Sequence, residues 1–467
     1  MAAQLYQTQS GRLFHAGVIS IVTVGLPARG KTHITRALTR YLNWLGVKTR
    51  TFHLGDYRRQ LVGPKSAEFF NPLNTETHEI RGQIAETAIN AMIDWFGEGG
   101  QVGIYDASNT SRQRRAELFN QLDSLGIHVM FIESICDNQD IVESNIRSVK
   151  VSSPDYLDWD PEKAAADFRL RINNHKPFYE TLDDNDKHLS YVKIINLQQM
   201  IMNNIRGYLE TRIVYYLMNL HITSRTIYFV RDAECEDEHI LSSNSHLSEA
   251  GHNYSHYVKE MIMRELENNI NNGDRNKCLK IWSSTLNRSV ETGYHFIEHE
   301  DECKSETSSV NGGTPTTLPA SLTTTTMTTK SHSKHYVNTN IYLEPRKALV
   351  PIHYGEAEGL SPQELAIKYP EEVVKHKKDP YRHRYPRAES YLELAIRLEP
   401  TILELEREKD DVVIIAHESV LRCIYAYFFD IPEREIPFLK FPRNYIVAAV
   451  PTSYGSKEVK IPLPKFV

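Results

Sequence analysis

The sequence predicts two successive α/β domains, each built around a mostly parallel sheet. The chain has 467 residues, more than one hydrophobic core usually holds, so two domains are the natural expectation. Short β-branched runs alternate with amphipathic segments in the first half, and the alternation starts again near residue 225. Segment 305–334 is rich in Thr, Ser and Gly, which indicates a disordered insertion. We therefore expect an N-terminal tail at 1–16, a first domain at 17–222, and a second domain at 223–467 that carries this insertion.

The spacing of apolar residues assigns strands and helices in both halves. In the first domain, strands are expected at 18–24, 102–105, 128–132 and 191–195, and helices at 31–45 and 79–96. In the second domain, strands are expected at 226–230, 279–282 and 412–415, and a helix at 391–406. Strands that alternate with helices in this way favour a parallel, doubly wound sheet.

Composition and charge narrow the class of protein. Hydrophobic residues make up 40% and charged residues 24%, which is typical of a soluble globular chain. The formal net charge of -6 gives no reason to expect a nucleic acid partner. No apolar run is long enough to span a membrane, and the N-terminus lacks the pattern of a signal peptide. The five cysteines are scattered without CxxC spacing, so we expect reduced thiols and a cytoplasmic location.

A phosphate-binding loop follows the first predicted strand. Residues 25–32 fit the pattern GxxxxGK[ST], with a strand before them and a helix after them. Backbone N–H groups of such a loop point at phosphate oxygens, and the helix N-terminus adds positive potential. Lys31 is expected to neutralise the β- and γ-phosphates of a nucleotide, and Thr32 to ligate Mg²⁺. The loop residues are Gly25, Leu26, Pro27, Ala28, Arg29, Gly30, Lys31 and Thr32.

Other residues indicate that the phosphoryl acceptor is an anion. Asp106 ends a predicted strand, as the Mg²⁺-associated aspartate of such folds does, and hydroxyls and arginines follow it over 107–115. Arg58 and Arg81 lie elsewhere in the same predicted domain. Guanidinium groups bind phosphate oxygens in a bidentate manner, so several arginines near this loop suit a phosphorylated acceptor. Taken singly, such arginines are more often surface residues, and an aspartate at a strand end is often only a cap.

These motifs together resemble a known family. The segments at 25–32, 57–59, 106–110, 131–136, 149–156 and 212–219 are similar to those of the bifunctional 6-phosphofructo-2-kinase/fructose-2,6-bisphosphatases, and the resemblance covers nearly the whole chain. It implies a P-loop kinase domain followed by a histidine-phosphatase-like α/β domain. It also implies transfer of the γ-phosphoryl of ATP, with Mg²⁺, to the 2-hydroxyl of fructose 6-phosphate. The product would be fructose 2,6-bisphosphate, a regulator of glycolysis.

The resemblance implies roles for individual residues of the first domain. Asp106 and Cys136 match active-site positions, and Lys31 and Lys150 complete the expected catalytic set. Asn145 and Lys150 match further ATP positions. One departure concerns His175, which stands where the family has a tyrosine four residues after Arg171. The positions that match the fructose 6-phosphate site are Arg58, Arg81, Ser108, Arg114, Lys150 and Arg171.

The second domain departs from the family at the residues that carry hydrolysis. Asp232 stands where the family has its nucleophilic histidine, and Pro351 stands in place of the general acid. A family Tyr, Arg and Lys are replaced by Pro362, His376 and Pro380, and Glu418 replaces a Gln. We therefore expect an inactive bisphosphatase domain. The degenerate site consists of Arg231, Asp232, Arg288, Pro351, His417 and Arg422.

Two alternatives stay open beside a kinase with an inactive second domain. One is a bifunctional enzyme with residual bisphosphatase activity, in which Asp232 acts as the nucleophile. The other is a non-catalytic sensor of nucleotide and sugar phosphate, although the intact set Lys31, Thr32, Asp106 and Lys150 speaks against it. The expected partners are fructose 6-phosphate and ATP, without nucleic acid or membrane, and the resemblance suggests a homodimer.

Overall fold

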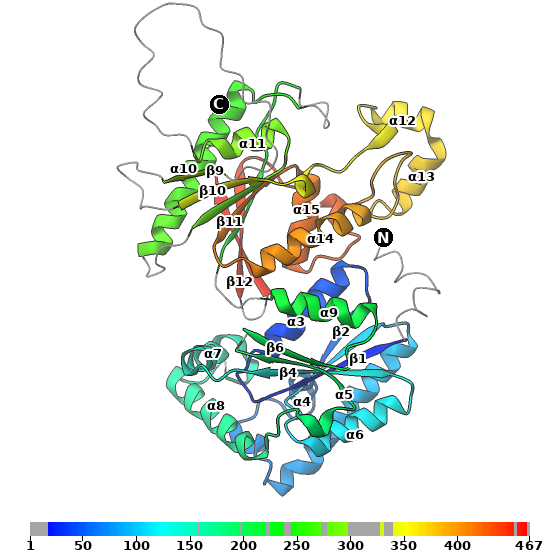
Figure 1. The fold of residues 1–467 in the computed structure, drawn as a ribbon, viewed down its shortest axis with the longest axis vertical. Coiled ribbons are helices and arrows are strands. Elements are labelled where there is room, and N and C mark those ends of the chain that lie inside the picture. Colours follow the sequence, from blue (N-terminus) through cyan, green and yellow to red (C-terminus); the bar gives the residue numbers. More distant parts are fainter. Residues whose placement is uncertain are drawn as a thin grey trace, which may run out of the picture. The chain divides into compact units, whose positions relative to one another are not determined.

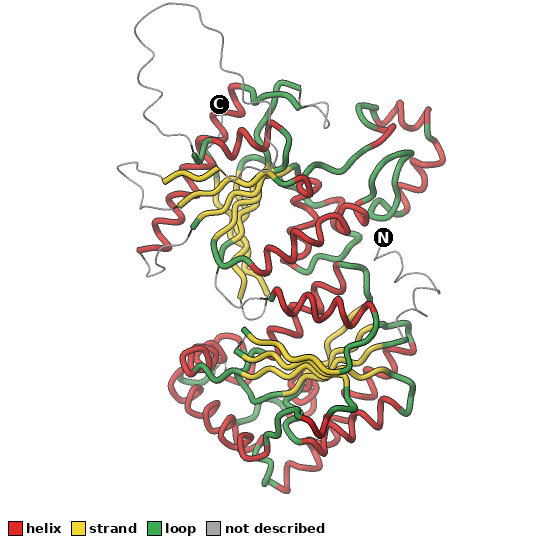
Figure 2. The backbone as a smooth tube through the Cα atoms, in the orientation of Figure 1, coloured by secondary structure: helices red, strands yellow, loops and turns green. Residues whose placement is uncertain are grey.

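The computed structural model describes residues 17–156, 158–196, 198–220, 225–237, 244–271, 278–297, 327–330, 340–452 and 455–464. Within helix α7 (Gln139–Ser152) the described residues do not include the side chains of 148–152, among them Lys150. The expected tail at 1–16 lies outside these residues. The chain forms two compact units, divided between Ile222 and Thr223, with 453–455 counted in the first. Figures 1 and 2 show the two units, and each is described here by itself.

The first unit has a six-stranded sheet with helices on both faces (Figure 1). The strand order is β2-β3-β1-β4-β5-β6, and every neighbouring pair is parallel except β5 and β6. Its strands are β1 Ile19–Val24, β2 Thr49–His53, β3 Val102–Asp106, β4 His128–Ile135, β5 Ser190–Ile195 and β6 Gln199–Asn203. Its α-helices are α3 Lys31–Trp44, α4 Leu54–Val62, α5 Thr75–Gly97, α6 Arg112–Asp123, α7 Gln139–Ser152, α8 Pro161–His175 and α9 Tyr208–Asn219.

Apolar strand positions explain why this sheet is covered on both sides. All six residues of β1 are buried, as expected for a central parallel strand. One face packs against α5 and α6 through Met92, Phe96, Leu118 and Leu122. On the other side, Tyr41 of α3 stacks on a tyrosine of α9 with ring centroids 4.2 Å apart. The layers leave the carboxyl ends of the parallel strands at one edge of the sheet, where ligand sites of such folds lie.

The second unit has a seven-stranded sheet in the order β13-β12-β7-β11-β8-β10-β9. The central pairs β7–β11, β11–β8 and β8–β10 are parallel, whereas β12 and β9 pair antiparallel to their neighbours β7 and β10. Its strands are β7 Ile227–Arg231, β8 Leu279–Ser283, β9 Met327–Lys330, β10 Asn340–Pro345, β11 Asp411–Ala416, β12 Tyr445–Thr452 and β13 Gly455–Pro462. Its α-helices are α10 Glu249–Asn271, α11 Asn287–Tyr294, α12 Pro362–Lys368, α13 Pro370–Lys378, α14 Tyr391–Arg407 and α15 Glu418–Phe429.

The strands and helices expected from the sequence are confirmed, with ends that shift by a few residues. One difference lies in segment 305–334, which we expected to be irregular. There Met327–Lys330 forms β9, which pairs with β10. The physical reason is that threonine favours strands, and the edge of β10 offers unpaired backbone groups. The other residues of that segment lie outside the described residues.

Candidate functional site

The phosphate-binding loop connects β1 to α3. Gly25 has φ 136°, and a side chain there would start 2.6 Å from the backbone oxygen of Ser134 on β4, so glycine is required. Ala28 holds the left-handed conformation at φ 60°, which is costly for a residue with a side chain. The Asn145 side chain donates to the Ala28 carbonyl at 3.1 Å, and the Ser134 hydroxyl donates to the Arg29 carbonyl. The loop is therefore held from two neighbouring elements, and Asn145, predicted to bind ATP, lies against it.

Lys31 and Asp106 lie at the centre of this site. The Lys31 ammonium donates to the carbonyls of Gly25 and Leu26 at 2.9 and 2.7 Å. Burial lowers the pKa of Lys31 to about 8, although the charge of Asp106 acts in the opposite direction. Asp106 ends β3 and is 2% exposed. Its carboxylate accepts from the Thr32 hydroxyl at 3.0 Å, so the two predicted Mg²⁺ ligands are neighbours.

Sequence reasoning missed one partner of Asp106. Nδ1 of His53, at the end of β2, lies 2.9 Å from the Asp106 carboxylate. Burial alone would raise the pKa of Asp106, but the hydrogen bond and charge of His53, together with Lys31 and Thr32, lower it below its usual value. The carboxylate is thus kept ionised. The position of His53 at the end of β2 could have revealed this contact, because the carboxyl ends of neighbouring parallel strands meet at one edge of the sheet.

Basic side chains of α3, α5 and α8 lie near the neutral imidazole of His175. The pKa of His175, at the end of α8, is lowered to about 4 by burial and by the charges of Arg171, Lys31 and Arg81. Burial also lowers the pKa of Arg171 and of Arg81. The charges that act on His175 show that Lys31 of α3, Arg81 of α5 and Arg171 of α8 lie near its ring. Two of the six residues predicted for the sugar phosphate, Arg81 and Arg171, are thus close to His175, and the charge of Arg171 also acts on Lys31.

Arg58 is held by an acidic partner that the sequence did not reveal. Its guanidinium is 4% exposed and donates to both oxygens of Asp155 at 2.7 and 2.5 Å. The Phe70 ring lies between two cations, with the guanidinium carbons of Arg58 and Arg171 at 5.0 and 3.6 Å from its centroid. Arg58 is therefore fixed next to Arg171.

Ser108 and Cys136 follow β3 and β4, whereas Arg114 lies on α6 and Lys150 on α7. The Ser108 carbonyl accepts from the Gly25 backbone at 2.9 Å, so the loop after β3 touches the phosphate-binding loop. Arg114 is one-third exposed and lies 3.5 Å from Glu117. Cys136 follows β4, and its thiol donates to the Asn138 carbonyl at 3.8 Å. The Lys150 side chain lies outside the described residues.

The degenerate site of the second unit also lies at the carboxyl ends of parallel strands. Arg231 ends β7, His417 follows β11, and Arg288 lies on α11. Asp232 is 1% exposed, and its carboxylate lies 3.1 Å from Nε of Arg288. The Ser289 hydroxyl donates to the same carboxylate oxygen at 3.4 Å.

Glu418 supplies the negative charge for the two remaining arginines. Its carboxylate lies 3.6 Å from Arg231 and 2.8 Å from Arg422. His417 caps α15, and burial lowers its pKa. Every arginine predicted for this site thus has a carboxylate of the chain itself beside it.

The fold and the first site define a nucleotide-dependent phosphotransferase of the P-loop class, followed by a second α/β domain. The family model described as 6-phosphofructo-2-kinase matches residues 6–224, and that of the histidine phosphatase superfamily (branch 1) matches 326–460. "6-phosphofructo-2-kinase/fructose-2,6-bisphosphatase 4" of Rattus norvegicus is 38% identical over 94% of this chain and 83% of its own length. "6-phosphofructo-2-kinase/fructose-2,6-bisphosphatase 1" of Homo sapiens is 37% identical over the same shares.

The chain therefore belongs to the 6-phosphofructo-2-kinase/fructose-2,6-bisphosphatase family and is a sugar-phosphate kinase. The predicted family and both α/β folds are confirmed.

Solved structures of phosphatases share only a weak likeness to the chain. A mycobacterial glucosyl-3-phosphoglycerate phosphatase is 14% identical with a TM-score of 0.33, covering 50% of this chain and 95% of its own. The alpha-ribazole phosphatase of Shigella flexneri is 12% identical with a TM-score of 0.34, covering 51% and 96%. A likeness this weak carries no argument about activity. In the described part of the chain, no helix has both the length and the apolar character that crossing a membrane requires.

Proposed function

We propose that this chain transfers the γ-phosphoryl of ATP to the 2-hydroxyl of fructose 6-phosphate, and that its second domain does not hydrolyse the product. The observation that carries the kinase half is the cluster of Lys31, Thr32 and Asp106 beside Arg81 and Arg171. It joins a nucleotide loop to a pocket for a second phosphate. The names of the relatives supply the identity of the acceptor and of the product, fructose 2,6-bisphosphate, which regulates glycolysis.

The nucleotide half of the site would hold ATP through residues 25–32. Lys31 exchanges its bonds to the loop carbonyls for bonds to the β- and γ-phosphates, and the negative charge there restores its protonated form. Thr32 and Asp106 would hold Mg²⁺, which would supply a Lewis acid that stabilises negative charge on the transferring phosphoryl group. The donor set fits this ion, because a hydroxyl and an ionised carboxylate lie 3.0 Å apart at Thr32 and Asp106. The Asn145 side chain supports the loop by its hydrogen bond to the Ala28 carbonyl.

The acceptor half would use the pocket on the other side of Lys31. Arg81 and Arg171 bind the 6-phosphate. Arg58 is already paired with Asp155 and lies near Arg171, so we assign it to the acceptor side on the family pattern. His175 is neutral at physiological pH, since its pKa is about 4, so it can donate one hydrogen bond without adding charge. We assign Ser108, in the loop after β3, and Arg114, on α6, to the acceptor side on the family pattern. We assign Lys150 and Cys136 to the site on the family pattern alone.

The second domain lacks what hydrolysis of a phosphate ester needs. A histidine nucleophile attacks as neutral imidazole, whereas Asp232 is an anion that would repel the ester and is already bonded to Arg288. Pro351 has no proton to give to the leaving alkoxide. Arg231 and Arg422 share Glu418, so a phosphate would have to displace a carboxylate from each cation. The self-neutralised arginines therefore support loss of both binding and chemistry.

The remaining parts of the proposal come from the family and the composition. We assign a tail at 1–16, the kinase domain to 17–222 and the phosphatase-like domain to 223–467. We also propose a cytoplasmic homodimer.

The test is product analysis of the purified chain. With ATP, Mg²⁺ and fructose 6-phosphate, ³¹P NMR should show a new phosphate at C2 of the sugar. Fructose 2,6-bisphosphate given alone should stay intact over the same period. A phosphate at another carbon would refute the assigned reaction, and loss of the bisphosphate would refute an inactive second domain.

A further inference from the structure

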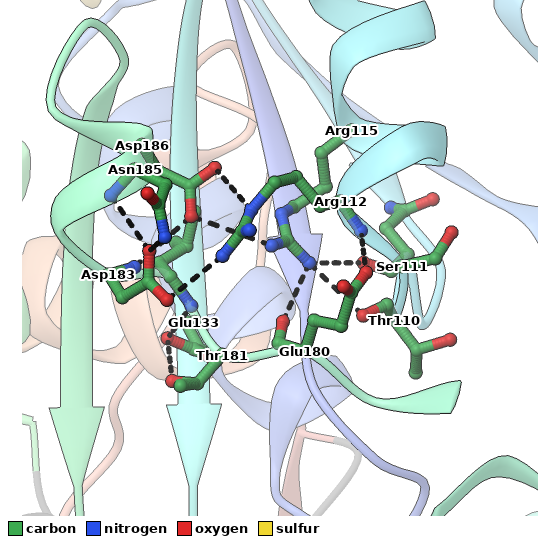
Figure 3. Close-up of polar contacts among 12 residues, drawn as sticks. Thr110, Ser111, Arg112, Arg115, Glu133, Glu180, Thr181, Asp183, Asn185 and Asp186 are labelled. Carbon is green, nitrogen blue, oxygen red and sulfur yellow. Dashed lines mark hydrogen bonds and ion pairs between the residues drawn. The ribbon is translucent and has the colours of Figure 1, made fainter. Parts of the chain in front are cut away.

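The first unit contains a buried polar cluster beside the proposed site that has no role in it so far (Figure 3). Its centre is Glu133 on β4, which is fully buried. The Glu133 carboxylate accepts from the Tyr179 hydroxyl at 2.5 Å, from the Thr181 hydroxyl at 3.1 Å and from the Leu182 backbone at 3.2 Å. Lys193 on β5 lies 3.7 Å away. A single carboxylate therefore holds the segment that leads out of α8.

The Tyr179 hydroxyl stays protonated and acts as a hydrogen-bond donor in this cluster. Burial raises its pKa, and the hydrogen bond to Glu133 raises it further, so the hydroxyl keeps its proton. Tyr179 follows His175 by only four residues, so the bond to Glu133 fixes where α8 ends. That helix carries both Arg171 and His175.

The same segment is bonded to the loop that follows β3. The Glu180 backbone donates to the Thr110 carbonyl at 2.9 Å. Fully buried Arg115 donates to the carbonyls of Thr110 and Glu180 at 3.1 and 2.8 Å. Figure 3 shows Arg115 lying between these two stretches of chain. The loop that carries Ser108 is thus joined, through Thr110 and Glu180, to the residue next to Tyr179.

The neighbour of Glu133 on β4 holds the other half of the site. The Ser134 hydroxyl donates to the Arg29 carbonyl in the phosphate-binding loop. Successive side chains of a strand point to opposite faces. One strand therefore fixes the nucleotide loop through Ser134 and the acceptor-side segment through Glu133.

We infer that Tyr179 is a positioning residue for the sugar-phosphate acceptor. Its hydroxyl, held by Glu133, fixes the segment after α8 against β4, and the next residue, Glu180, joins that segment to the loop after β3. This inference rests on the proposed function. It assigns no chemical step to Tyr179. Its loss should affect the acceptor more than the nucleotide, because the Ser134 hydroxyl and the Asn145 side chain hold the nucleotide loop without it.

The test is Tyr179→Phe, which removes the hydroxyl and keeps the ring. We expect the KM for fructose 6-phosphate to rise about tenfold, the KM for ATP to stay within about twofold, and the melting temperature to change little. Tyr191→Phe, the same chemical change on β5, is the matched control and should leave both KM values unchanged. Equilibrium binding of fructose 6-phosphate in the presence of a non-hydrolysable ATP analogue provides a second readout that does not need turnover.

A conservative variant of Glu133 distinguishes a positioning role of Tyr179 from a general contribution to stability. Glu133→Gln keeps one acceptor oxygen for the Tyr179 hydroxyl, so its KM for fructose 6-phosphate should lie between those of wild type and Tyr179→Phe. An unchanged KM for fructose 6-phosphate in Tyr179→Phe overturns the inference, and so does an equal rise in both KM values. A wild-type chain that neither binds nor phosphorylates fructose 6-phosphate would instead refute the proposed function.

Discussion

Replacing Asp232 should destabilise the second domain, because this residue forms a buried ion pair with Arg288. The side chains of Asp232 and Arg288 are 2% and 4% exposed, and their charged atoms lie 3.1 Å apart. Removing one partner of a buried pair leaves the other charge uncompensated, which costs about 3–5 kcal/mol. For a domain of this size that corresponds to a fall of roughly 6–20 °C in melting temperature.

Differential scanning calorimetry of Asp232→Ala measures this effect, and kinase activity of the same sample shows that the first domain is folded. Asp232→Asn is the matched control, since it keeps the volume and one acceptor for Arg288 and should lose less. The double variant Asp232→Ala/Arg288→Met should recover part of the loss, because it removes both charges. A melting temperature of Asp232→Ala within about 2 °C of wild type would contradict the assigned role, since an uncompensated buried charge costs more than that.

Three further outcomes follow from the two sites. Lys31→Ala should reduce kinase turnover by at least 100-fold, because the transferring phosphoryl group loses the cation that neutralises it. A loss of less than about tenfold, which is a barrier change of only about 1.4 kcal/mol, would contradict this role of Lys31. The kcat/KM for ATP should be constant below pH 8 and fall above it. The reason is that the pKa of Lys31 in the free enzyme is about 8 and only the protonated form attracts phosphate. A flat pH profile up to pH 9.5 would exclude control of ATP binding by Lys31. Glu418→Gln should allow the second domain to bind inorganic phosphate, detected by calorimetry, without hydrolysing the bisphosphate; binding as weak as in wild type would show that Glu418 does not block the arginines.

The fold could be predicted well because its signals are local. The run of β-branched residues at 18–24 and the helical spacing at 31–45 both lie within one element, and the motif between them requires that context. The strand β9 was missed because composition alone does not reveal an exposed edge to pair with. The exposed edge belongs to β10, which lies outside the insertion in the sequence.

The site could be predicted only in part because pairings are three-dimensional. The motif gave Lys31 and Thr32, and a strand end gave Asp106. The sequence could not show that Asp155 binds Arg58, which lies 97 residues earlier. Nor could it distinguish Arg114, which is one-third exposed, from its neighbour Arg115, which is fully buried in a structural cluster. Burial, which decides between these roles, depends on the packing of segments far apart in sequence.

One incubation tests the central claim most directly. The purified chain receives ATP labelled at the γ-phosphate, Mg²⁺ and fructose 6-phosphate, and the label is followed in the sugar bisphosphate and in inorganic phosphate. We predict that label accumulates in fructose 2,6-bisphosphate while free phosphate stays at the level of a control without enzyme. Continuous release of labelled phosphate from the bisphosphate would reveal an active second domain. A failure to transfer label at all would contradict the kinase assignment itself.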